Sequence, residues 1–161
     1  DAPNKELMQK IDRPLFDDFW QRMLDCLDLL KTRDYRTCIR LTLIKDENMI
    51  DLQGYASLIR KGNPDFLELK SYMWVGASQN YYNKESMPSM DEVREFSKQL
   101  LEYLPEYEIM REHLPSRVVL LIKKSLNRKS WIDFPKFFQL LETGKSFTAE
   151  DYCSRVIMPN E

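Results

Sequence analysis

Hydrophobic positions near one end of the chain recur at the spacing of an amphipathic helix. Between positions 15 and 30 the apolar side chains fall three or four residues apart, which predicts a helix over residues 13–32. Asp12 can cap this helix, and Pro14 lies in its first turn, where a missing N–H costs little. We therefore expect one long helix here, packed through a single apolar stripe.

Two later stretches are continuous runs of β-branched and aliphatic residues, which is typical of buried strands. They cover residues 37–45 and 66–72. A helix over 50–61, ended by the turn sequence at 62–64, is predicted between them. Buried strands that are separated by helices favour parallel β-α units.

The rest of the pattern predicts another helix, a strand pair and a last helix. Ser89 and Glu92 have the spacing of a capping box, so a helix is expected from residue 89 to about 103. Short strands are expected at 107–111 and 117–123, and the last helix is expected from about residue 133 to just before Gly144.

Together these elements predict the α/β class. Two β-α units and a strand pair do not close a ring, so the expected fold is the later, C-terminal portion of a larger β/α sheet or of a partial (β/α) TIM-like barrel. Residues 1–130 would form the β/α units, and 131–161 would form a helical extension. In such folds function lies at the C-terminal ends of the strands, here at Lys45, at Lys70 with Tyr72, and at Lys123.

Composition narrows the classes of function. The chain is 43% hydrophobic and 31% charged with a net charge of −2, which fits a folded domain and excludes a uniformly basic nucleic-acid binder. It has neither an apolar run long enough to span a membrane nor a signal-peptide pattern at its N-terminus. Its three widely spaced cysteines, Cys26, Cys38 and Cys153, predict no metal site and favour a reducing, cytoplasmic compartment.

Lys45 and Lys70 are the candidate catalytic residues, because each ends a buried strand. Burial would lower the pKa of such an amine and let it attack a carbonyl to form a Schiff base. The alternative is that both amines simply reach solvent while their stems pack. Glu68 alternates with Lys70 and could form an ion pair or a proton-transfer pair with it, whereas Arg40 could hold an anion or pair with an internal carboxylate.

Segment 117–129 gathers five cations before Trp131. Arg117, Lys123, Lys124, Arg128 and Lys129 could contact an RNA backbone, or they could belong to a solvated strand and turn. His113 lies near Ser116, but nothing in the sequence indicates the orienting group or the oxyanion hole of a hydrolase. Ser116 with Arg117 fits a phosphate contact or a contact with a neighbouring loop better.

Several ordered blocks resemble one family, the tRNA 4-demethylwyosine synthases, which are radical S-adenosylmethionine enzymes. The blocks cover 40–49, 64–72, 87–96 and 107–121, while 12–20 and 134–138 look like the eukaryotic branch. The resemblance implies a radical SAM type of barrel with a wyosine-formation region at about 64–123. It also implies a lyase of wybutosine biosynthesis that condenses N1-methylguanosine at position 37 of phenylalanine tRNA with pyruvate.

The resemblance further implies cofactors that this chain would not bind alone. Such enzymes hold a [4Fe–4S] cluster and S-adenosylmethionine through a CxxxCxxC motif, which this chain lacks. The cluster is expected in a missing N-terminal half of the barrel, and flavin mononucleotide (FMN) in a domain further upstream. The isolated chain is therefore expected to be inactive.

The resemblance carries site residues over as well. Lys45 or Lys70 would hold pyruvate as a Schiff base, and Arg40, Glu68, Ser116 and Arg117 would bind substrate. The family's glycines after the two lysines are Asp46 and Ser71 here, which is expected to add bulk near the site. Two other hypotheses remain: a non-catalytic tRNA-binding module that uses segment 117–129, and a scaffold without activity of its own.

Overall fold

The computed structural model describes residues 1–155 and contains two sheets and six α-helices within that range. The elements, in chain order, are α1 (Lys5–Asp12), α2 (Phe19–Lys31), β1 (Cys38–Leu43), α3 (Leu52–Gly62), β2 (Phe66–Ser71), the 3-10 turns η1 (Gly76–Asn80) and η2 (Lys84–Ser86), α4 (Met90–Tyr103), β3 (Tyr107–His113), β4 (Val118–Lys123), the 3-10 turn η3 (Lys124–Leu126), β5 (Lys129–Ile132), α5 (Phe134–Glu142), α6 (Ala149–Tyr152) and β6 (Cys153–Arg155).

The main sheet is mixed, with the strand order β1-β2-β4-β3. β1 and β2 are parallel and are joined through α3, as predicted, whereas β4 runs antiparallel to both β2 and β3. The mixed α/β class is thus confirmed. Because Ile122 near the end of β4 is aligned with Phe66 at the start of β2, Lys123 lies at the opposite end of the strands from Lys45 and Lys70. Our placement of Lys123 with the other two lysines was wrong.

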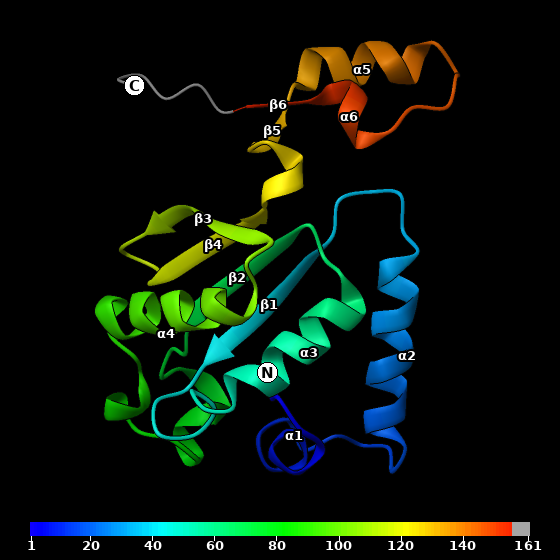
Figure 1. The fold of residues 1–161 in the computed structure, drawn as a ribbon. Coiled ribbons are helices and arrows are strands. Elements are labelled where there is room, and N and C mark those ends of the chain that lie inside the picture. The colour runs from blue at the N-terminus through cyan, green and yellow to red at the C-terminus, as the bar shows by residue number, and fades with distance from the viewer. Residues whose placement is uncertain (156–161) are drawn as a thin grey trace.

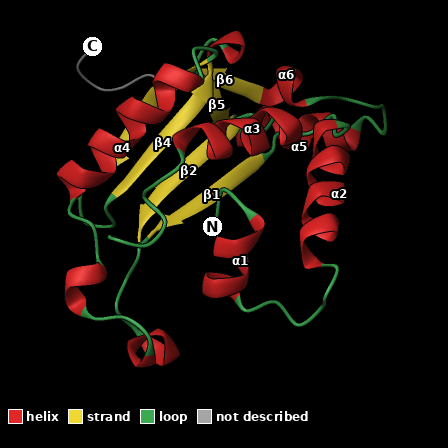
Figure 2. Cartoon of the chain, turned by 60° about the horizontal axis from the view of Figure 1, so that its bottom comes forward, coloured by secondary structure: helices red, strands yellow, loops and turns green. Residues whose placement is uncertain are grey.

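Helices cover one face of the main sheet and leave the other face open (Figures 1 and 2). In β2 the side chains of Leu67, Leu69 and Ser71 point toward the helices and are fully buried. Phe66, Glu68 and Lys70 alternate with them and are half-buried, as period-2 alternation requires. Among the described residues no helix crosses this second side, which we call the open face.

The predicted helix over 13–32 is wrong in its first third, because residues 13–18 are not helical and separate α2 from an earlier helix, α1, that the sequence did not predict. Asn4 caps α1 by accepting a hydrogen bond from the Leu7 N–H at 2.9 Å, and Arg13 ends the helix with a left-handed backbone, φ 48°. Arg13 precedes Pro14, and a residue before proline is disfavoured in the α region. α2 therefore begins only at Phe19.

The segment after η3 forms a small unit at one end of the sheet, in which β5 pairs with β6 (Figure 1). The sequence predicted α5 but neither of these strands. Arg36 ties the unit to the main sheet, because its guanidinium contacts Asp65 at 3.4 Å and also Glu150 of α6. No helix among residues 1–155 is long and apolar enough to cross a membrane.

Candidate functional site

The parallel pairing of β1 and β2 brings their C-terminal ends to one edge of the sheet. Thr42 is aligned with Lys70, and Leu43 with Ser71. Antiparallel β4 starts at this same edge, where the Ser71 N–H donates to the Arg117 carbonyl at 3.0 Å. Residues from three strands and from the β3–β4 turn therefore meet here, as the expected location of the site requires.

Lys70 stands on the open face at this edge. Its neighbours across the strands are Thr42 on β1 and Val118 on β4. The lysine is half-buried, and its amine has no hydrogen-bond or ion-pair partner among the described residues. An unpaired amine on an uncovered sheet face is available to a ligand.

Lys45 is placed differently, because its amine is already engaged. Its Nζ lies 2.5 Å from Oε1 of Glu92, the third residue of α4, and the other oxygen of Glu92 accepts from the Ser89 N–H at 2.8 Å. The hydrogen bond that the Lys45 amine donates to Glu92 raises the pKa of Lys45, and the same contact lowers the pKa of Glu92. An amine held protonated in this way is a poor nucleophile.

Arg40 and Glu68 pair with each other across β1 and β2 on the open face. The Arg40 Nη2 lies 2.8 Å and its Nε 2.9 Å from the same Glu68 oxygen, Oε2. The internal carboxylate considered as a partner for Arg40 is therefore Glu68, which does not bond to Lys70. One Glu68 oxygen and part of the exposed guanidinium remain available beside Lys70.

The turn between β3 and β4 holds Ser116 and Arg117 at the rim of this edge. The Ser116 hydroxyl lies 2.8 Å from Nδ1 of His113, and the Arg117 Nη1 donates to the Pro88 carbonyl at 3.1 Å. Arg117 itself has φ 48°, the left-handed region. Both side chains thus contact neighbouring residues at the site edge. Of the phosphate contact and the loop contact that the sequence allowed, these are loop contacts.

Asp46 and Ser71, which follow the two lysines, were expected to add bulk near the site, and Ser71 does not do so on the open face. Asp46 has φ 62°, which is backbone that glycine adopts most readily. Ser71 is fully buried on the helix side, and its hydroxyl donates to the Pro88 carbonyl at 2.9 Å. Ser71 therefore takes no space on the open face and instead anchors the loop that precedes α4.

The cations of segment 117–129 do not form one free surface. Lys123 donates to the Asn63 carbonyl and Lys124 to the Pro105 carbonyl, each at 2.6 Å, while Arg128 contacts Glu108 and Lys129 contacts Glu150. Partial burial lowers the pKa of Lys123. These four cations also lie at the end of the sheet away from Lys70, near η3 and β5 (Figure 1). The arrangement gives no support to a separate RNA-binding module.

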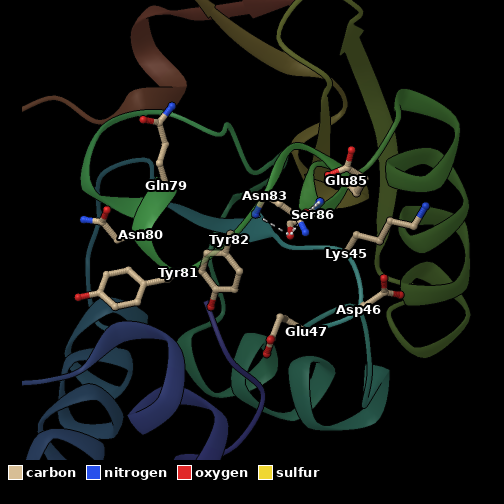
Figure 3. A pocket seen from close by; sticks show the side chains of 10 residues that line it. All are labelled: Lys45, Asp46, Glu47, Gln79, Asn80, Tyr81, Tyr82, Asn83, Glu85 and Ser86. Atoms are coloured by element: carbon tan, nitrogen blue, oxygen red, sulfur yellow. Dashed lines mark hydrogen bonds between the residues drawn. The ribbon is translucent and has the colours of Figure 1, made fainter.

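A feature that the sequence did not reveal is a polar hollow of about 510 Å³ above the C-terminal end of β1 (Figure 3). We call it the polar hollow; its lining residues are Lys45, Asp46, Glu47, Gln79, Asn80, Tyr81, Tyr82, Asn83, Glu85 and Ser86. A second, more apolar hollow of about 560 Å³ lies on the open face between Phe66, Leu120 and Trp131. The clustering of tyrosine and amide residues at 79–83 was the only available signal for the first.

Among residues 1–155, no three cysteine, histidine or carboxylate side chains gather as metal ligands do. Cys26, Cys38 and Cys153 are all free thiols on different elements, and burial raises the pKa of the Cys38 thiol. A [4Fe–4S] cluster needs several thiolates at one place. The three thiols therefore do not fit that cluster.

Comparison with known proteins gives a consistent set of relatives. Residues 61–123 match the family described as wyosine base formation. The chain is 40% identical to the human S-adenosyl-L-methionine-dependent tRNA 4-demethylwyosine synthase TYW1 over 96% of its own length, and 42% identical to the rice synthase over 94%. It spans only about a quarter of those proteins, 23% and 24% respectively.

Solved structures agree with the sequence relatives. A structure of TYW1 with a lysine–pyruvate adduct bound matches with a TM-score of 0.68 and 34% identity, over 78% of this chain and 39% of that one. An archaeal TYW1 crystal structure matches with a TM-score of 0.61 and 30% identity, over 78% and 38%. The mixed sheet and its helices are thus the fold of one segment of TYW1.

Proposed function

This chain is homologous to the tRNA 4-demethylwyosine synthases, and from that premise we propose that it works as one segment of such an enzyme and supplies part of its substrate surface. The proposed reaction is the condensation of N1-methylguanosine-37 of phenylalanine tRNA with pyruvate, in a radical S-adenosylmethionine lyase of the wybutosine pathway. The open face would look into the reaction space, as the inner face of a partial (β/α) barrel that the rest of the enzyme completes.

The single observation that carries this proposal is the position of Lys70. It offers an unpaired amine on the open face, at the edge where β1, β2 and the β3–β4 turn converge. An amine in that position can attack the ketone of pyruvate to form an imine, or it can hold the pyruvate carboxylate as an ion pair. Lys45 fits neither task, because Glu92 already holds it.

The Arg40–Glu68 pair would complete the binding surface. Glu68 is two residues from Lys70 on the same side of β2, and Arg40 faces it from β1. The guanidinium can orient an incoming carboxylate or phosphate while Glu68 prevents the arginine from turning away. Ser116 and Arg117 would hold the rim of the site in place through the contacts with His113 and Pro88.

The cofactors belong to other parts of the proposed enzyme. When bound there, the cluster and S-adenosylmethionine would supply the radical that starts the reaction, and FMN would lie in a further domain. Since the thiols of this chain do not fit a cluster, we expect the chain to be inactive alone. Three free cysteines are typical of a reducing compartment, so we place the enzyme in the cytoplasm.

The test is complementation of cells that lack the synthase with the longer protein containing this chain. Tricyclic wyosine bases in tRNA would be measured by mass spectrometry. Lys70→Ala should abolish the product, whereas Lys98→Ala, an exposed lysine on the helix side, should leave it unchanged. Lys70→Arg tells the two roles apart, because it keeps an ionic contact but cannot form an imine. Normal product from Lys70→Ala would contradict the proposal.

A further inference from the structure

His113 has no part in the proposed role of Lys70, yet the pairing of the strands puts both residues in one row of the open face. Lys70 on β2 is aligned with Val118 on β4, and Val118 is aligned with His113 on β3. Directly paired residues carry their side chains on the same face of a sheet. His113 therefore faces the same side as Lys70, with the valine between them.

The residue before His113 shows independently which way the histidine points. Glu112 is aligned with fully buried Val119, and its Oε2 lies 2.8 Å from Nη2 of Arg94 on α4. Glu112 thus lies on the helix side of the sheet, and the next residue of the strand faces the opposite side. His113 is exposed there, at the edge where β1 and β2 end.

The separation of the two side chains suits a small substrate held between them. Two strand spacings put the Cα atoms of Lys70 and His113 roughly 10 Å apart. Val118 between them is half-buried and carries no polar side-chain group. Pyruvate bound to the Lys70 amine above this valine can bring its ketone oxygen within reach of the imidazole, directly or through a water. The inference rests on the proposed function, because it takes pyruvate as the ligand of Lys70.

Ser116 holds the imidazole ring by one nitrogen and leaves the other available. The Ser116 hydroxyl lies 2.8 Å from Nδ1 of His113, across the turn that joins β3 to β4. The other ring nitrogen, Nε2, has no hydrogen-bond partner among the described residues. A ring that is oriented through Nδ1 and open at Nε2 is typical of acid–base catalysis, in which the second nitrogen exchanges the proton.

The other polar side chains beside Lys70 on this face are poorer proton donors. Glu68 is nearer to Lys70, but it is a carboxylate paired with Arg40 at 2.8 Å, and an ionised carboxylate only accepts hydrogen bonds. Thr42 offers a hydroxyl, which is a far weaker acid than an imidazolium. Imidazole both gives and takes a proton readily near neutral pH.

We propose that His113 is a catalytic residue that transfers a proton as the imine forms between pyruvate and Lys70. The neutral Lys70 amine attacks the ketone carbon, and a proton from its nitrogen passes to the former ketone oxygen, which gives a carbinolamine. The imidazolium of His113 then donates a proton to the carbinolamine hydroxyl. Water leaves with the electron pair of the C–O bond while the nitrogen lone pair forms the C=N bond. The products are the protonated imine, water and neutral His113, which regains its proton from solvent.

The time course of imine formation tests this role, because a proton-transfer residue changes the rate and not the final amount of adduct. The longer protein that contains this chain is incubated with pyruvate, samples are quenched with borohydride after increasing times, and the reduced adduct on Lys70 is measured by mass spectrometry. His113→Ala should slow adduct formation about a hundredfold or more, the usual size of an acid–base contribution, and should reach the same plateau. Leu114→Ala, which truncates the exposed neighbour in the same turn, should leave both unchanged.

Rescue by an added base separates catalysis from a structural role. Free imidazole should restore part of the lost rate in His113→Ala and should not accelerate Leu114→Ala. Ser116→Ala, which removes the hydroxyl that orients the ring, should slow the reaction less than His113→Ala does, and Ser116→Thr should restore the rate. A wild-type rate in His113→Ala, or a lost rate that imidazole leaves unchanged, would overturn the proposal.

The two proposals fail in distinguishable ways. If no adduct forms on Lys70 in the wild-type protein, the imine role of Lys70 is lost, and the role of His113 is lost with it. If the adduct forms on Lys70 equally fast in the wild type and in His113→Ala, the role of His113 alone is lost and that of Lys70 stands.

Discussion

Asn48 holds the loop after β1 together, and its removal should cost a large share of the protein's stability. The residue is fully buried, and its Oδ1 accepts from the Ile44 N–H at 2.6 Å. Its Nδ2 donates to the carbonyls of Thr42 and Asp1, each at 2.8 Å. Asn48→Ala leaves at least the Ile44 N–H and the Thr42 carbonyl without their partner. At about 1–3 kcal/mol for each of these two unsatisfied groups, we expect a loss of about 2–6 kcal/mol, against a typical total of about 5–15 kcal/mol.

The assay is urea unfolding followed by circular dichroism at neutral pH. Gln99→Ala, which truncates an exposed amide on α4, serves as the control and should change the free energy of unfolding little. Asn48→Ala should also loosen the loop after β1, which holds Lys45, Asp46 and Glu47. A loss of less than about 0.5 kcal/mol would show that water replaces the amide at low cost, and would refute the reasoning.

Three other contacts lead to measurable changes. Leu69→Ala, at a fully buried position of β2, should lower the free energy of unfolding by about 2–5 kcal/mol in the same urea assay, and a loss under about 1 kcal/mol would contradict the packing. Glu92→Gln should bring the pKa of Lys45 back down toward its ordinary value, measured by NMR titration of the lysine; an unchanged pKa would mean that the ion pair does not form in solution. Contacts with Lys129 and Arg36 lower the pKa of Glu150, so their stabilising effect is present above the carboxyl's ordinary pKa of 4.5 and is lost as the pH falls through the lower folded value; amide shifts of β6 should change over that interval in the wild type and not in Glu150→Gln.

The elements that could be predicted are those with local signals. β1, α3, β2 and α4 were expected from aliphatic runs, the 62–64 turn and the Ser89–Glu92 capping box, and all four are present. The early helix was wrong at its start because the apolar spacing outweighed the Arg13–Pro14 signal. β5 and β6 are short, and they form only by pairing with each other across the intervening helices.

The candidate site, too, could be predicted only in part from the sequence. That Lys70 would lie at a strand end followed from the sequence, and its unpaired amine followed only from the fold. Which partner each charge takes could not be predicted, because Lys45–Glu92 and Arg40–Glu68 join residues 47 and 28 positions apart in the chain. The polar hollow depends on the path of segment 73–88, which has no regular pattern.

The central claim is that the open face is the substrate side of the enzyme and that Lys70 meets pyruvate there. Lysine acetylation by a mild acylating reagent, mapped by mass spectrometry on the longer protein with and without pyruvate, measures this directly. We predict that pyruvate protects Lys70 and leaves Lys98 equally reactive. Equal labelling of Lys70 in both conditions would contradict the account.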